Sequence, residues 1–314
     1  DRNAATGDQV TRYEYGVTLA DSDLASNDLL RAEIYPAATD STDRFTYAYN
    51  RQGQRKRMRD PNGSIHDYEY DLLGRPVGDA VVTLADGLDG TVRRIGQAYD
   101  VRGMVRMATS YGNVAGTSVV NEVRNEYNNF AQLQEQYQEY AGAVNTGTTP
   151  KVQYGYADGS TNTIRPTSMT YPNGRVLEYL YDDTHADKLS RIRTLRWDGV
   201  DVCRYGYLGL GTFVVTDYLQ PQVKLDYARG HGANPYTGFD RFGRIVDLLW
   251  AKYAGNGSSS SSSSGGPGNA LVHLQYGYDR SSNRIYRRDK VARSYGKSFD
   301  ELYEYDRLNQ LKKL

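Results

Sequence analysis

The sequence predicts an all-β protein built from consecutive antiparallel β-hairpins. Three observations lead to this prediction: an alternating aromatic motif recurs along the chain, most copies end in a turn signal, and the apolar residues lack the 3.6-residue spacing of a helix. The stretch Gln132 to Tyr140 is the closest to an exception, and a strand is favoured there as well. No helix is expected.

The clearest copy of the motif is Tyr68 to Val77, which reads Tyr-Glu-Tyr-Asp-Leu-Leu-Gly-Arg-Pro-Val. Its two tyrosines lie two residues apart and therefore point to the same face of one strand. Asp71 ends that strand, and a carboxylate there can accept hydrogen bonds from the N–H groups of the turn. Gly74 supplies the positive φ that the turn requires. Arg75 opens the returning strand, where its guanidinium can pair with Asp71.

Further copies follow in order. The aromatic residue before the acid or its substitute recurs at 49, 70, 99, 127, 156, 181, 239, 278 and 305, and most steps are 21 to 29 residues. A degenerate copy at Tyr207 occupies the longest step. Between two copies stands a turn signal in which a proline presets φ and Asn-Gly tolerates positive φ; its residues are Asp60, Pro61, Asn62 and Gly63. The residues with structural roles in the motif are Tyr68, Tyr70, Asp71, Gly74, Arg75, Phe239, Asp240, Gly243, Arg244, Tyr276, Tyr278, Asp279, Tyr303, Tyr305 and Asp306.

Each residue of the motif has a role in building a hairpin, and none requires chemistry. We expect neighbouring hairpins to stack their aromatic rings into a ladder, in which each cross-strand pair contributes about 0.2–1 kcal/mol. The acid–arginine pair recurs at Asp240 with Arg244 and in part at Asp279 with Arg284. An active site seldom recurs in this way, whereas a hairpin corner must. We therefore predict no catalytic, cofactor-binding or metal-binding residue.

Composition agrees with a broad, well-hydrated sheet. The 314 residues include 29 tyrosines against 6 phenylalanines and 2 tryptophans, and tyrosine suits half-buried strands. Lys+Arg and Asp+Glu are equal at 38 each, which removes the simplest electrostatic argument for nucleic acid or an anionic membrane. The single cysteine, Cys203, excludes an intramolecular disulfide, and no apolar run is long enough to span a bilayer.

The longest interruption of the repeat is a Ser/Gly-rich segment at residues 255–269. Such a composition predicts a flexible loop. Because the repeat resumes in phase after it, we expect a hairpin loop inside one repeat region, 1–314, and no domain boundary. Both ends of the chain fall inside repeats, so we expect a fragment of a larger protein.

The pattern Tyr-x-Tyr-Asp-x-x-Gly-Arg-hydrophobic, with Asp-Pro-Asn-Gly between copies, resembles the YD repeat of the Rhs family. Related repeats occur in insecticidal toxin-complex shell subunits and in teneurins. The resemblance extends from about Tyr13 to Leu314, and it is strongest at Tyr68 to Val77 and Phe239 to Val246. It implies a ribbon of hairpins that spirals into a barrel-like shell, which in several members encloses a C-terminal toxin domain or plug. This sequence departs from such members because no Asp-Pro-x-Gly cleavage core and no toxin-like domain follow its last repeat; Asp60-Pro61-Asn62-Gly63 resembles that core, but we expect it to be a turn between repeats.

Other candidate sites have simpler interpretations. The four histidines are scattered, and the one acidic–histidine cluster, Asp182-Asp183 with His185 and Asp187, is best explained as a solvated loop. The acidic stretch 86–90 lacks the ligand pattern of an EF-hand. Cys203 lies in an alternating stretch and is expected to be a buried apolar residue.

Two features of the sequence bear on binding, and only the second leaves a binding function open. The basic run Arg51 to Arg59, flanked by tyrosines, has the composition of a single-strand nucleic-acid site, but zero net charge and the adjacent Asp60 argue against nucleic acid. Aromatic ladders with acids and amides also suit carbohydrate rings, although the same tyrosines are already needed by the hairpins.

The resulting hypothesis is a non-enzymatic structural segment of a large bacterial secreted or cell-surface protein, forming the wall of a β-spiral shell, stalk or filament. Its expected partners are adjacent repeats or other copies, through exposed strand edges. One alternative is an adhesin for glycans or proteins, and another is part of a toxin-encapsulating cocoon. The secreted or surface location follows from the resemblance, since the sequence itself shows no signal peptide.

Overall fold

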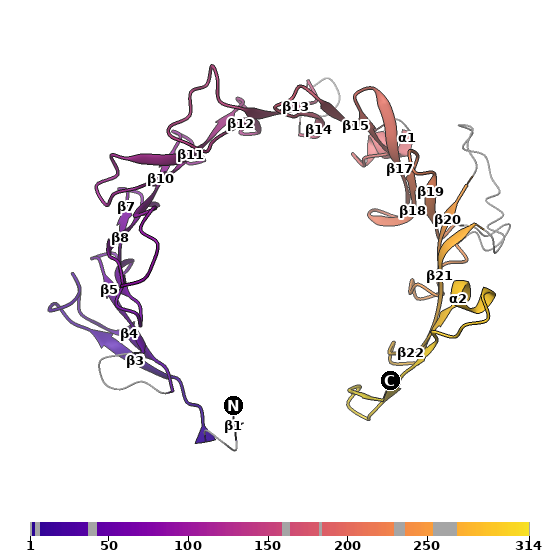
Figure 1. Ribbon diagram of the computed structural model, residues 1–314, viewed down its shortest axis with the longest axis horizontal. Coiled ribbons are helices and arrows are strands. Elements are labelled where there is room, and N and C mark those ends of the chain that lie inside the picture. Colours follow the sequence, from indigo (N-terminus) through magenta and orange to yellow (C-terminus); the bar gives the residue numbers. More distant parts are fainter. Residues whose placement is uncertain are drawn as a thin grey trace. The chain divides into compact units, whose positions relative to one another are not determined.

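The computed structural model describes residues 2–3, 7–36, 43–158, 164–181, 184–228, 236–253 and 269–313. Within these ranges nearly all regular structure is antiparallel β-strand, and the strands follow one another along the ribbon in chain order (Figure 1). The chain divides into two compact units, Asp1–Tyr154 and Gly155–Leu314. The prediction of an all-β protein made of consecutive hairpins is confirmed. The winding of the ribbon into a barrel-like shell stays a prediction.

In the first unit, β1 and β2 form a separate two-stranded sheet, and β3 to β13 each pair antiparallel with their neighbours in sequence. The strands are β1 (Arg2–Asn3), β2 (Gly7–Asp8), β3 (Arg12–Val17), β4 (Ser26–Ile34), β5 (Arg44–Tyr49), β6 (Arg55–Arg59), β7 (Ile65–Tyr70), β8 (Pro76–Thr83), β9 (Arg94–Tyr99), β10 (Val105–Tyr111), β11 (Val119–Tyr127), β12 (Leu133–Glu139) and β13 (Lys151–Tyr156). The preference for a strand at Gln132 to Tyr140 is confirmed by β12.

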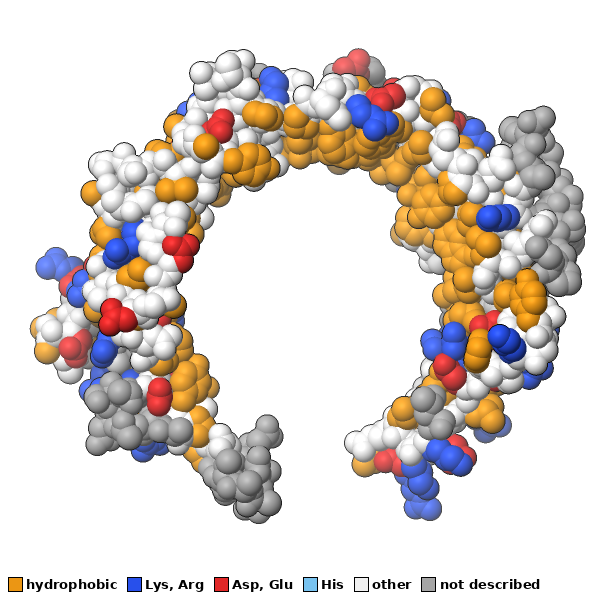
Figure 2. Space-filling view, viewed as in Figure 1, with side chains coloured by type: hydrophobic (Ala, Val, Ile, Leu, Met, Phe, Trp, Pro, Cys, Tyr) orange, Lys and Arg blue, Asp and Glu red, His pale blue; other side chains and the backbone are white. Residues whose placement is uncertain are grey.

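The second unit continues the same pairing pattern. Its elements are β14 (Pro166–Thr170), β15 (Val176–Leu180), α1 (Thr184–Lys188), β16 (Thr194–Trp197), β17 (Val200–Leu208), β18 (Thr212–Tyr218), β19 (Val223–Asp226), β20 (Asp247–Lys252), β21 (Ala270–Tyr278), β22 (Arg284–Asp289), α2 (Lys290–Ser294), β23 (Glu301–Leu302), β24 (Glu304–Tyr305) and β25 (Leu311–Lys313). Hydrophobic side chains form a band over β15 to β20 (Figure 2).

The two helices correct the expectation that the chain has none. Each is only five residues long. Helix α2 forms because the side chain of Asp289 caps it, accepting a hydrogen bond from Ala292 N–H at 2.9 Å. His185 and Asp187, expected in a solvated loop, lie in α1, while Asp182 and Asp183 are outside the described residues.

The ribbon has little conventional core. One cluster of buried residues in the first unit joins Val17, Tyr47 and Tyr49, with partly buried hydrophobic residues around it. Most strand residues are half-buried, as the high tyrosine content predicts. Stability must therefore come largely from hydrogen bonds and from contacts between neighbouring strands.

The Ser/Gly-rich segment predicted at 255–269 lies outside the described residues, except for Asn269, whose carbonyl accepts a hydrogen bond from Lys252 N–H at 2.8 Å. The strands on either side of it, β20 and β21, pair antiparallel. That the segment is a flexible loop inside one repeat region stays a prediction.

Candidate functional site

The hairpin corner is a polar arrangement that recurs along the described part of the chain, so its geometry shows what the motif does. Asp71 opens a corner between β7 and β8. Its Oδ1 accepts hydrogen bonds from the backbone N–H groups of Leu73 (2.9 Å) and Arg75 (3.0 Å), and its Oδ2 accepts one from Arg75 Nε (2.7 Å). Gly74, with φ of 80°, donates its N–H to Asp71 O at 2.9 Å. This is a three-residue hairpin loop that ends in a left-handed residue.

The geometry explains why the corner begins with an acid or an amide. The fourth residue, which is left-handed, donates its N–H to the backbone carbonyl of the first residue. The N–H of the fifth residue therefore has no carbonyl partner in the corner. The Asp71 side chain supplies the missing acceptor. Hydrogen bonds from the Arg75 backbone and guanidinium hold the pKa of Asp71 below its ordinary value.

The corner at Asp240 repeats these contacts. Its carboxylate accepts from Phe242 N–H (2.9 Å), Arg244 N–H (3.0 Å) and Arg244 Nε (2.7 Å), and Gly243 has φ of 76°. Burial acts to raise the pKa of Asp240, but the hydrogen bonds from Arg244 outweigh it and leave the pKa below its ordinary value. Phe239 forms an isolated bridge with Ile245 at the start of this corner.

Two corners replace the ion pair with a pair of amides. Asn50 Oδ1 accepts from Gln52 and Gln54 N–H, and Asn50 Nδ2 donates to Gln54 Oε1 at 3.0 Å. Asn128 and Gln132 form the same arrangement, with a side-chain bond of 2.7 Å. In these four corners the first and fifth residues are aspartate with arginine or asparagine with glutamine, whereas Asp100 has Met104 as its fifth residue and pairs with Arg102 instead.

The C-terminal corners depart from the expected acid–arginine pair. Asp279 accepts hydrogen bonds from the backbone and side chain of Asn283, at 2.8 and 3.0 Å. Arg284, expected in part as the partner of Asp279, lies instead over the ring of Tyr276, with its guanidinium carbon 4.5 Å from the centroid. Asp306 caps its corner through Leu308 and Gln310 N–H.

The arginine of a corner also contacts the next repeat. The guanidinium carbon of Arg75 lies 4.3 Å from the centre of the Tyr99 ring, and that of Arg244 lies 4.7 Å from the centre of Tyr278. Such cation–π contacts contribute about 0.5–1 kcal/mol at exposed sites. The expected ladder of tyrosine rings is therefore wrong between these repeats, because an arginine covers the ring.

In most copies the second tyrosine forms a further link, which sequence reasoning missed. Its hydroxyl donates to a backbone carbonyl of the preceding repeat, usually near the start of that repeat's returning strand. Tyr70 donates to Arg55 O (2.8 Å), and Tyr127 donates to Val105 O (2.9 Å). The same bond is made by Tyr49 to Leu30, Tyr99 to Pro76, Tyr181 to Pro166, Tyr207 to Ile192, Tyr278 to Ile245 and Tyr305 to Arg284.

Successive corners are also joined directly. Gln54 Nε2 donates to Gly74 O at 2.7 Å, and Arg102 Nη1 donates to Asn128 O at 2.6 Å. In the second unit, Arg244 Nη1 donates to Asp279 O at 3.2 Å.

The remaining motif residues also have structural partners. Tyr68 lies on the same strand as Tyr70, and its ring stacks on His66 with centroids 6.2 Å apart. Tyr303 donates to the carboxylate of Glu301. In the Asp60-Pro61-Asn62-Gly63 turn, Asp60 accepts from Ser64 N–H at 2.8 Å and Gly63 has φ of 97°.

The groups considered for chemistry do not converge. No three His, Cys, Asp or Glu side chains gather into a possible metal site within the described ranges. His66 pairs with Asp79 at 2.8 Å, and His273 pairs with Asp247 at 3.2 Å, each as an isolated contact. Burial raises the pKa of the Cys203 thiol, and this residue is buried on β17 as expected. None of the helices in the described part of the chain is long and apolar enough to cross a membrane.

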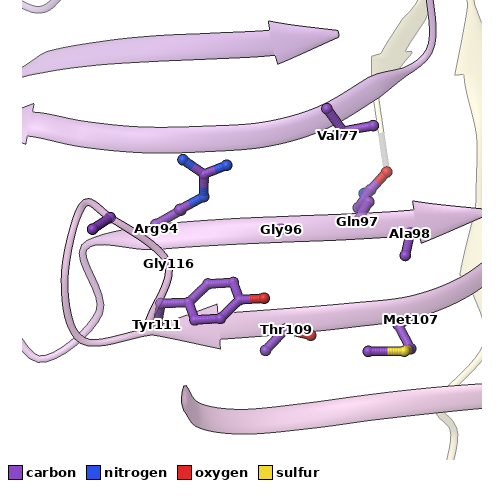
Figure 3. A pocket seen from close by; sticks show the side chains of 10 residues that line it. Val77, Arg94, Gly96, Gln97, Ala98, Met107, Thr109, Tyr111 and Gly116 are labelled. Atoms are coloured by element: carbon purple, nitrogen blue, oxygen red, sulfur yellow. The ribbon is translucent and has the colours of Figure 1, made fainter. Parts of the chain in front are cut away.

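A pocket of about 150 Å³ in the first unit lies over Gly96, between β8, β9 and β10 (Figure 3). The ring of Tyr111 lies beside Gly96, where an added Cβ would come within 2.9 Å of it. Arg94 is paired with both oxygens of Glu69, at 2.8 and 2.5 Å, so its charge is already compensated. The pocket holds no pair of groups suited to acid–base or nucleophilic catalysis.

Neither a family model nor a curated protein matches the sequence. Solved structures do share the fold. The chain is similar to one in the crystal structure of the TcdB2-TccC3-Cdc42 complex, with a TM-score of 0.55 and 15% identity, over 99% of this chain and 16% of that chain. It is also similar to a chain of the Photorhabdus luminescens Tc holotoxin pore carrying a TccC3 mutation, with a TM-score of 0.50 and 14% identity, over 96% of this chain and 15% of that chain.

This chain thus spans about one sixth of the length of the chains that it matches. Two independent observations now agree: the spacing of the corners along the sequence and the arrangement of the hairpins in space. The chain has the fold of the YD-repeat shell proteins found in these toxin complexes.

Proposed function

We propose that residues 1–314 are a non-enzymatic structural segment that forms part of the wall of a larger YD-repeat protein. The observation that carries the proposal is the structural role of the polar positions that recur in the motif. An aspartate or asparagine side chain closes each described corner, and tyrosine hydroxyls join most repeats to the one before. Residues that recur in this way are already engaged in holding the ribbon together.

The proposal treats 1–314 as one repeat region, with the Ser/Gly-rich segment 255–269 inserted between β20 and β21. Its partners are neighbouring repeats or other copies, because strands at the ends of a sheet present unpaired N–H and C=O groups. The similarity to toxin-complex chains supports a secreted protein and a shell in preference to a stalk or filament.

Electron microscopy of the full-length protein that contains this segment tests the proposal. We expect a hollow particle with residues 1–314 in its wall. A solid particle, or residues 1–314 standing apart as an appendage, would contradict the wall function. A variant with both Tyr127→Phe and Tyr278→Phe loses two hydrogen bonds between repeats. We expect it to form a less stable particle of the same composition.

A second candidate is the cocoon, in which the wall encloses another domain. The similarity to chains of the Tc holotoxin favours it over the adhesin. Limited proteolysis of the full-length protein distinguishes the two: an enclosed domain is protected until the wall is opened by denaturant. For the adhesin, a glycan array probed with 1–314 should give reproducible binding that is lost on replacing exposed tyrosines; we expect none.

A further inference from the structure

A cavity of about 480 Å³ lies in the second unit, between two neighbouring hairpin connections. One is the connection between β17 and β18, residues 208–212, which belongs to the degenerate copy of the motif and is called the degenerate connection. The other contains the corner at Asp240, between β19 and β20. A volume of this size falls within the range of about 300–1,000 Å³ that small-molecule sites occupy. The lining includes Leu208, Thr212, Tyr236, Phe239, Asp240 and Arg241.

The cavity occurs where a link between neighbouring connections is missing. In other repeats the fifth residue of a corner reaches the next corner, as Gln54 does to Gly74 O at 2.7 Å. The equivalent position of the degenerate connection is Thr212, whose short side chain forms no hydrogen bond with a described residue. No hydrogen bond joins residues 208–212 to residues 240–244, both of which the structure describes in full. Threonine in place of glutamine or arginine therefore leaves space between the two connections.

Three polar side chains at the cavity have no hydrogen-bond or ion-pair partner within the described ranges. They are the hydroxyls of Thr212 and Tyr236 and the guanidinium of Arg241. The guanidinium carbon of Arg241 lies 4.7 Å from the centre of the Phe242 ring, a contact that uses the face of the guanidinium and leaves its N–H groups free to donate. The cavity thus offers several hydrogen-bond donors to a ligand.

The one carboxylate in the lining is already engaged. Asp240 accepts hydrogen bonds from Phe242 N–H and Arg244 N–H through one oxygen and from Arg244 Nε through the other. Its charge is therefore paired with Arg244, whose side chain also donates to Asp279 O. The corner 240–244 contains two arginines and one aspartate, so the positive charge of Arg241 is left over. The electrostatics of the cavity favour an anion.

Apolar side chains complete the lining. The ring of Phe239 packs against that of Tyr227, with centroids 4.8 Å apart, and its backbone forms a bridge with Ile245. These contacts hold the Phe239 ring in place beside the cavity. Leu208 adds a second apolar surface from the degenerate connection. An apolar lining with a few convergent polar groups is the usual composition of a small-molecule site.

We propose that this cavity binds an amphiphilic carboxylate, in which a free carboxylate is attached to an apolar or aromatic group. Arg241 pairs with the carboxylate, and the hydroxyls of Thr212 and Tyr236 donate hydrogen bonds to the polar end of the ligand. The apolar group lies against Leu208 and Phe239. One unpaired guanidinium balances one negative charge, which favours a carboxylate over a dianionic phosphate. A neutral sugar fits less well, because the carboxylate in the lining has no free oxygen to accept its hydroxyl groups.

A ligand-observed NMR titration of the 314-residue chain tests the proposal. The probes are N-acetylphenylalanine and its amide, which has the same ring but no negative charge. We expect saturable binding of the acid with a dissociation constant on the order of 1 mM. The amide should bind about tenfold or more weakly than the acid, because the charge-assisted hydrogen bonds to the guanidinium are lost.

Two substitutions assign the binding to the cavity. Arg241→Gln should weaken binding of the acid by about tenfold or more and leave binding of the amide unchanged. Thr212→Val keeps the shape of the side chain and removes its hydroxyl, so it should weaken binding of the acid by roughly threefold.

The matched control is Arg280→Gln. Arg280 has the same position in the corner at Asp279 as Arg241 has in the corner at Asp240, and it is exposed without a hydrogen-bond or ion-pair partner among the described residues, but it does not line the cavity. This variant should bind the acid as wild type does. Circular dichroism and urea unfolding verify that every variant is folded. Equal binding of acid and amide, no saturable binding of the acid, or equal loss in the two arginine variants would each overturn the proposal.

Discussion

At the scale of single residues, the first position of a corner performs two tasks. Asp71 accepts backbone hydrogen bonds through one oxygen and holds the Arg75 guanidinium through the other, and Arg75 then covers the ring of Tyr99. The amide corner shows that the first task does not need a charge, because Asn50 accepts the same two backbone bonds. The carboxylate therefore matters chiefly for placing the arginine.

Asp71→Asn should lower stability near neutral pH but not in acid. The folded state holds the pKa of Asp71 below its ordinary value of 3.8, so the ionised group stabilises the fold above that pH. This contribution is lost as pH falls below 3.8 toward the lower pKa of the folded state. Urea midpoints of wild type and variant should differ at pH 7 and converge in that acid range. The control is Asp28→Asn, because the carboxylate of Asp28 is exposed and contacts no described side chain. Its urea midpoint should equal that of wild type at every pH.

Tyr127→Phe tests the link between repeats. It removes the hydroxyl that donates to Val105 O and leaves the ring in place, so the free energy of unfolding should fall by about 1 kcal/mol. Tyr140→Phe removes a hydroxyl that has no hydrogen-bond partner among the described residues, and should have no measurable effect. Equal urea midpoints for the two variants would mean that the inter-repeat bond adds nothing to stability.

At the scale of elements, the corner keeps one backbone shape while its sequence varies. The fourth residue is left-handed in each of the seven described corners. It is glycine at Gly53, Gly74, Gly103 and Gly243, but other residues take this conformation at Ala131 (φ 65°), Ser282 (φ 68°) and Asn309 (φ 60°). The sequence alone predicts a turn with glycine there. It does not predict that alanine occupies the same conformation, because the neighbouring strands impose it.

Two reciprocal substitutions measure this imposed strain. Ala131→Gly should stabilise the protein by about 0.5–1 kcal/mol, because glycine enters the left-handed region without steric cost. Gly53→Ala should destabilise it by about 1 kcal/mol through the backbone alone, since a Cβ at that position meets nothing within 4 Å. Urea unfolding of both variants gives the comparison. Effects of the same sign would show that side-chain contacts decide these positions.

The sequence predicts the hairpins well because alternation and turn residues are local signals. It predicts the corner residues for the same reason: Asp71, Gly74 and Arg75 lie within five positions of one another. The contacts between repeats, such as Tyr127 with Val105, span 22 residues and depend on register, which no local pattern specifies. The bulge between Glu126 and Tyr127 sets that register, and the residue types at these positions do not predict a bulge.

At the scale of the whole molecule, the alternation of connections gives the sheet of the first unit two different edges. The corners after β5, β7, β9 and β11 lie on one edge, and the connections after β6, β8, β10 and β12 lie on the opposite edge. The overall composition cannot show this difference. It appears only when each connection is assigned to an edge.

The same alternation divides the ribbon into a constrained side and a permissive side. Corners in the first unit always occupy five positions, such as 50–54 and 128–132, whereas connections on the other side range from 60–64 to 140–150. Length on the permissive side can change without moving any tyrosine or arginine that joins the repeats. Foreign peptides could therefore be inserted into the connections on that side, at a spacing set by the strands. The contacts that join the repeats would be unchanged.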